Sequence, residues 1–108
     1  MALPHALSGE VVDVQPYGTH IEAAQSVALF KAGQLEVMRL VLQVGQRMPS
    51  HHVVGEITLH CLEGSVQVEV GGEHHCLPAG HLMYVAGSVP HALEAPQQAS
   101  SVLVTIAL

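Results

Sequence analysis

Histidine is the residue type with chemical potential that this sequence carries in unusual number. Nine of its 108 residues are histidine. A neutral imidazole is the commonest metal ligand in proteins, and it is also the side chain that titrates near neutral pH. The enrichment is therefore compatible with a metal site, with a pH response, or with solvated surface positions. The nine are His5, His20, His51, His52, His60, His74, His75, His81 and His91.

Some of these histidines are better placed for metal binding than others. His74 and His75 follow a Gly-Gly turn, so we expect them to be solvated surface residues. The stronger candidates lie in two short segments, and a glutamate stands among them. The candidate metal ligands are His51, His52, Glu56, His60 and His91.

Other catalytic patterns and several partner classes are excluded. The sequence contains no glycine-rich phosphate loop, serine nucleophile elbow or Cys-x-x-Cys pair. Three Lys+Arg against nine Asp+Glu give a formal net charge of −6. So few cations cannot neutralise phosphates, so neither a nucleic acid nor an anionic membrane surface is expected as a partner.

We expect β-strands to carry the candidate metal ligands. Glycine and proline recur at close intervals from Gly33 to Pro96, which leaves room for strands but little for helices. In the segment 65–70 three valines alternate with polar residues before the Gly71-Gly72 turn, as in a half-buried hairpin strand. Further strands are expected at 56–61, 82–85 and 102–108, with two more between 28 and 44 that flank residues 32–34. The sequence predicts an all-β fold.

The length and composition favour one compact domain over residues 1–108. Hydrophobic residues make up 49% of the chain and charged ones 11%, so a core can form, but 108 residues are too few for two cores. Residues 1–27 are the least regular part, with a short helical turn expected at 19–25. The first ten residues lack a cationic start and a sustained apolar segment, so we expect a cytoplasmic location. Cys61 and Cys76 are then expected to be free thiols.

Two segments together resemble the conserved motifs of the cupin superfamily. The first runs from Gly45 through His51 to Gly64 with the spacing of that family, and the second runs from Gly80 to His91. The short stretch between them is typical of small bacterial cupins. The resemblance covers residues 35–108 and implies a single-domain jelly-roll barrel of two packed antiparallel sheets.

The first motif departs from the family at two of the four usual ligand positions. His51 and His91 are retained, but Val53 stands at the second histidine position and Ile57 at the glutamate position. Two imidazoles alone would hold a divalent ion weakly, because protein-bound metals usually have about three or four protein ligands.

A third ligand has two possible sources in the sequence. His52 is adjacent to His51, and Glu56 and His60 would turn inward if a bulge shifted their strand by one residue. The alternation opposes this shift, because it would expose the apolar face of the strand.

The resemblance leaves two functions open. In the first, His51 and His91 with a third group hold Fe, Mn, Ni or Zn, which implies dioxygenase- or isomerase-like chemistry on a small organic molecule. In the second, the protein is not an enzyme and holds no metal. It then either binds a small ligand in an apolar cavity near Val53, Ile57 and Met83, or acts as a scaffold.

A homodimer is expected from the high apolar fraction, and the resemblance to the family also implies one. The terminal strand at 102–108 and the N-terminal segment are the candidate contacts.

Overall fold

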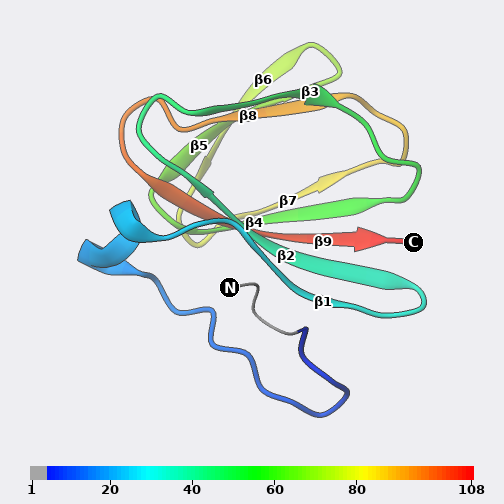
Figure 1. Cartoon of the computed structure of the whole chain (residues 1–108). Coiled ribbons are helices and arrows are strands. Elements are labelled where there is room, and N and C mark those ends of the chain that lie inside the picture. Colours follow the sequence, from blue (N-terminus) through cyan, green and yellow to red (C-terminus); the bar gives the residue numbers. More distant parts are fainter. Residues whose placement is uncertain (1–4) are drawn as a thin grey trace.

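The computed structural model describes residues 5–108 as two antiparallel sheets packed face to face (Figure 1). The first sheet has the order β1-β2-β9-β4-β7, and the second has the order β3-β8-β5-β6. The predicted all-β fold of two packed antiparallel sheets is confirmed. The elements are a 3₁₀ helix η1 (Gly18–Ala23) and the strands β1 (Val27–Lys31), β2 (Leu35–Leu42), β3 (Arg47–His51), β4 (Ile57–Glu63), β5 (Ser65–Val70), β6 (Glu73–Pro78), β7 (Leu82–Val85), β8 (His91–Glu94) and β9 (Ser100–Ala107).

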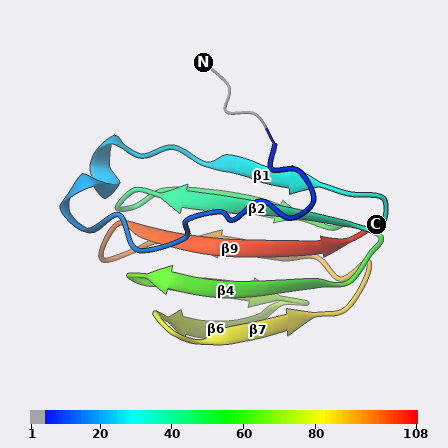
Figure 2. The ribbon, with the colours of Figure 1, turned by 90° about the horizontal axis from the view of Figure 1, so that it is seen from below.

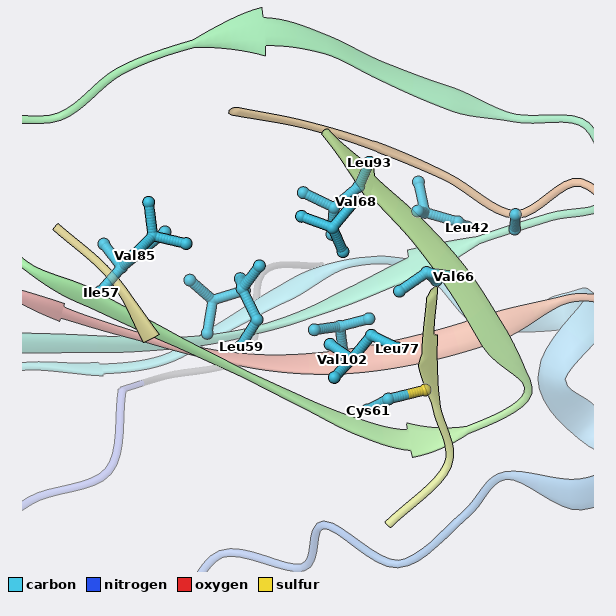
Figure 3. Packing of buried hydrophobic residues seen from close by; sticks show 12 residues of the cluster. Leu42, Ile57, Leu59, Cys61, Val66, Val68, Leu77, Val85, Leu93 and Val102 are labelled. Atoms are coloured by element: carbon cyan, nitrogen blue, oxygen red, sulfur yellow. The ribbon is translucent and has the colours of Figure 1, made fainter. Parts of the chain in front are cut away.

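The core lies between the two sheets and is aliphatic (Figure 3). In β5, Val66 and Val68 are fully buried, whereas Gln67 between them is exposed. In β4, Leu59 is 1% exposed and faces the same core. Each such side chain stabilises the fold by about 1.5–3 kcal/mol through its removal from water.

The register of β4 shows that the one-residue shift considered above does not occur. Ile57 and Leu59 point into the core and pair with Val85 and Met83 of β7. His60 therefore lies on the outer face of the sheet. The inward positions go to the apolar set because burying it is favourable, whereas burying an unpaired polar set is costly.

Gly64 and Ser88 are two of the motif residues whose backbone angles lie in the left-handed region. Gly64, between β4 and β5, has φ +80°, and an added Cβ would lie 2.7 Å from the carbonyl oxygen of Ala99. Ser88 has φ +64°, and it is the one non-glycine residue among residues 5–108 whose φ is positive. It stands where the second cupin motif has glycine, so the turn keeps its shape without the residue type that suits it.

Residues 5–26, here called the N-terminal arm, lie against the outer face of the five-stranded sheet, from β1 and β2 to the Glu63 end of β4 (Figure 2). Arg39 of β2 is 3% exposed, and its guanidinium donates to the carbonyl oxygen of Gln15 at 2.7 Å and to Glu63 at 3.0 Å. The ring of Tyr17 lies 3.8 Å from the same guanidinium. The arm is thus fastened through a buried ion pair.

The short helix in the arm differs slightly from the expectation. η1 begins at Gly18 and ends at Ala23, and no side chain caps its N-terminus. Among the described residues, no helix is long and apolar enough to cross a membrane.

Candidate ligand site in the barrel

His51 and His91 face each other across two neighbouring strands. They are register partners on β3 and β8, so their side chains emerge on the same face of the four-stranded sheet. Their ring centroids lie 4.4 Å apart at an interplanar angle of 58°. The sequence motifs therefore place both retained histidines at one site.

These two rings form the polar end of a cavity between the sheets. The cavity has a volume of about 50 Å³. His91 is 3% exposed, whereas His51 is exposed, so the cavity meets solvent on the His51 side. The rest of the lining is apolar and comes mainly from strands of the facing sheet: Met38, Leu40, Met48, Val53, Ile57, Leu59, Val104 and Ile106.

Backbone carbonyls fix the protonation of both rings. Nδ1 of His51 lies 3.2 Å from the carbonyl oxygen of Pro49, and Nδ1 of His91 lies 3.1 Å from that of Val89. A carbonyl oxygen can only accept, so each Nδ1 carries a hydrogen and donates it. In the neutral ring, each Nε2 then holds an unshared electron pair.

The environment of His91 favours its neutral form. Burial lowers the pKa of His91, and the nearby His51 and His52 lower it further, while the hydrogen bond to Val89 opposes the shift. His91 is therefore uncharged at neutral pH, and its Nε2 is an acceptor there.

The structure brings together four of the residues predicted for the site. His51, His91, Val53 and Ile57 all line the cavity. The two aliphatic residues at the altered ligand positions thus face the retained histidines, and they make the wall of the cavity apolar where the motif has polar groups.

The other predicted residues do not reach the cavity. His52 is exposed beside His51, and Glu56 is exposed on the other side of the sheet near Tyr84. His60 is half-buried on the outer face of β4. Met83 pairs with Leu59 and packs against the core without lining the cavity.

The donor set does not fit a resident divalent metal. The cavity lining contains two imidazoles and no carboxylate or thiol. Among residues 5–108, no group of three or more His, Cys, Asp or Glu side chains is gathered as metal ligands. A tightly held ion needs about three or four protein ligands, so this set is incomplete.

Most of the apolar lining was not predicted as part of the site. Met38 and Leu40 point inward from β2, and Val104 and Ile106 point inward from β9. Their alternation along each strand marks an inward face, but only the packing of the sheets shows which inward residues border a cavity.

The fold and the site geometry define a small double-sheet β-barrel with its pocket between the sheets. Residues 38–107 match the model of the Cupin domain family (Cupin_2), and the chain therefore belongs to the cupin family. No curated protein matches the chain.

Solved structures agree on the fold. A conserved protein of unknown function from Streptococcus pyogenes superposes with a TM-score of 0.75 at 19% identity, covering 99% of this chain and 94% of that one. The protein TT1209 from Thermus thermophilus has a TM-score of 0.73 at 23% identity, covering 91% and 96%. An RmlC-like cupin from Shewanella frigidimarina has a TM-score of 0.71 at 21% identity, covering 76% and 73%. Similarity at this level of identity shows a shared fold.

Proposed function

We propose that the protein is a small-molecule-binding cupin without a resident metal, whose ligand lies in the cavity with its polar group at His51 and His91. The observation that carries this proposal is the composition of the lining: eight apolar side chains and two imidazoles. Ligand sites in proteins are concave and mostly apolar, with a few convergent polar groups that fix orientation.

The cavity limits the size of the ligand. Its volume of about 50 Å³ is room for roughly three or four water molecules. A ligand of a few non-hydrogen atoms fits inside, and a longer one would extend through the mouth beside His51. The apolar walls exclude water, and the rings orient the polar group.

Binding rather than turnover is supported by the groups at hand. The lining has no nucleophilic hydroxyl or thiol and no carboxylate, so the two imidazoles, which could act as general bases, have no nucleophile or acid beside them in the lining. The dioxygenase- or isomerase-like chemistry implied by the family depends on a metal, and the donor set does not fit one. We therefore favour the non-enzymatic function, binding of a small molecule.

The proposal is tested by methyl-detected NMR during a screen of small organic molecules. A ligand should shift the methyl signals of Val53, Ile57 and Val104, and the variant Val104→Leu should abolish this binding by filling the cavity. The variant His60→Ala, on the outer face of the same sheet, should bind as the wild type does. Shifts confined to residues outside the cavity, or binding that survives Val104→Leu, would contradict the proposal.

We also propose that two copies meet through the outer face of β4 and β7. Leu82 and Tyr84 of β7 are 68% and 60% exposed there, next to the half-buried Thr58 and His60 of β4. The arm lies over β1 and β2 and reaches the Glu63 end of β4, and β7 lies beyond it (Figure 2). Since the chain carries a formal charge of −6, copies meet most easily at a face with few charged side chains, and here Glu56 lies beside Tyr84.

A further inference from the structure

We infer that the ligand of this cavity is a compact neutral molecule that donates a hydrogen bond, in its simplest form an alcohol, and not an anion or a carbonyl compound that can only accept. The inference rests on the proposed function and specifies its ligand class. It follows from the hydrogen bonds that fix the two rings and from the ion pairs that hold the Lys and Arg side chains outside the cavity.

Both rings offer the same kind of group to the cavity, a hydrogen-bond acceptor. In each, Nδ1 donates to the carbonyl oxygen two residues earlier in the chain, at 3.2 Å for His51 and 3.1 Å for His91. Two independent strands thus fix the same tautomer. In each neutral ring the electron pair of Nε2 remains for a ligand, so the site with both rings neutral accepts hydrogen bonds and does not donate them.

The Nε2 atom of His91 is open to a ligand. Among the described residues, the one buried side-chain nitrogen or oxygen without a hydrogen-bond partner is Nε of Arg39. His91 is nearly buried as a residue and makes its hydrogen bond through Nδ1. Its Nε2 is therefore reached by solvent, and the solvent it can meet is that of the cavity.

No lysine or arginine lines the cavity to balance an anionic ligand. The chain has three Lys and Arg residues, and each is engaged outside the cavity. Arg39 binds Glu63 under the arm at 3.0 Å, Lys31 lies 3.8 Å from Glu36, and Arg47 lies 3.8 Å from Glu69. With both rings neutral, a carboxylate in the cavity would be desolvated opposite two electron pairs, which is strongly unfavourable.

An acceptor-only ligand is also disfavoured. A ketone oxygen would lose its hydrogen bonds to water and find no donor on either ring, at a cost of about 1–3 kcal/mol. A hydroxyl donates to one Nε2 and suffers no such loss. This difference corresponds to at least about a fivefold preference for the alcohol.

A first experiment reads the tautomers directly. Long-range ¹H–¹⁵N correlation spectra of the histidine rings at neutral pH, recorded with a chelator present, should show both His51 and His91 protonated at Nδ1 and unprotonated at Nε2. A signal for Nε2-protonated His91 would overturn the inference whatever the cavity binds.

A second experiment compares 2-propanol, acetone and acetate, which are equal in their number of non-hydrogen atoms. NMR titrations should show 2-propanol shifting the cavity methyls with a Kd at least about fivefold lower than that of either other probe. Val104→Leu should abolish the effect, and His60→Ala should leave it unchanged.

The outcomes distinguish an error in the ligand class from an error in the proposed function. Equal or tighter binding of acetone or acetate in the cavity overturns the ligand class and leaves small-molecule binding standing. Failure of all three probes, and of every compound in the broader screen, to reach the cavity overturns the proposed function itself.

Discussion

Individual side chains decide what the cavity can hold. Val53 stands at a histidine position of the cupin motif and lines the cavity with His51 and His91. The variant Val53→His adds a third imidazole at this wall. Structural zinc sites bind with about 10–16 kcal/mol from four ligands, so one added ligand contributes about 3 kcal/mol, or about a hundredfold in affinity.

Isothermal titration calorimetry with Zn²⁺ measures this gain. The exposed substitution Val44→His is the matched control and should leave the affinity at the wild-type level, because no second imidazole lies beside it in sequence. Equal Zn²⁺ affinity of wild type and Val53→His would show that the aliphatic replacement is not what weakens the site.

Ser88 shows a second departure from the motif, and here the consequence is stability. A non-glycine residue at φ +64° is strained by about 1–2 kcal/mol, while glycine costs about 0.4–1 kcal/mol in unfolded-chain entropy. Ser88→Gly should therefore raise the free energy of unfolding by about 0.5 kcal/mol. Urea denaturation measures it.

The control for this substitution is Ser50→Gly, at an exposed strand position without positive φ. It should lower the free energy of unfolding. If Ser88→Gly lowers stability as much as Ser50→Gly does, the left-handed conformation at position 88 carries no strain.

At the scale of elements, the arm is held to β2 and β4 by Glu63. Burial raises the pKa of Glu63, but the N–H groups of Tyr17 and Gly18, the hydroxyl of Ser101 and the charge of Arg39 outweigh it, and the pKa is lowered overall. A carboxyl group whose pKa is lower in the folded state contributes stability above its ordinary pKa. That contribution is lost as the pH falls through the lowered value.

Glu63→Gln should therefore cost about 3 kcal/mol at neutral pH, because it leaves the Arg39 charge buried without its partner. The loss should shrink in acid, where the wild-type carboxylate is itself protonated. Denaturation from pH 7 to pH 2 checks both statements. Glu36→Gln, which breaks the exposed pair with Lys31, should change stability by less than about 1 kcal/mol. A loss for Glu63→Gln that does not depend on pH would contradict the ionic fastening.

The elements also show what the sequence could and could not predict. Strands with one buried face, such as β4 and β5, carry the period-two pattern and were predicted close to their observed bounds. The edge strands β3 and β6 were missed, because four of the five residues of β3 and the first four of β6 are exposed. Their pairing with β8 and β5 makes them strands, and no alternation marks such pairing.

Only part of the candidate site could be predicted from the sequence. The motif spacing placed His51 and His91 together, and the alternation placed Ile57 inward. The spacing gave no way to see that the wall opposite would come from β2 and β9, because those residues are adjacent to the histidines only across the packed sheets.

At the scale of the whole molecule, the proposed contact between copies differs in place from the sequence-based expectation. β9 lies in the middle of its sheet with both edges paired, so it offers no edge to a partner. On the outer face of the five-stranded sheet, the most exposed large apolar side chains are Leu82 and Tyr84 on β7. The N-terminal arm is already engaged with its own sheet.

Light scattering at micromolar concentration should give twice the mass of the chain. Tyr84→Glu should give the monomer mass without loss of stability, since the side chain is 60% exposed. Val11→Glu, at a residue 97% exposed on the arm, should leave the dimer intact. A monomeric wild type would contradict the contact.

We propose that the two imidazoles bind a small molecule and not a resident metal. Plasma emission spectroscopy on protein purified without an affinity tag or chelator, beside the double variant His51→Ala/His91→Ala, measures the metal content. We expect Fe, Mn, Ni and Zn far below one atom per chain, at the same level in both proteins. Close to one metal per chain in the wild type, lost in the double variant, would contradict it.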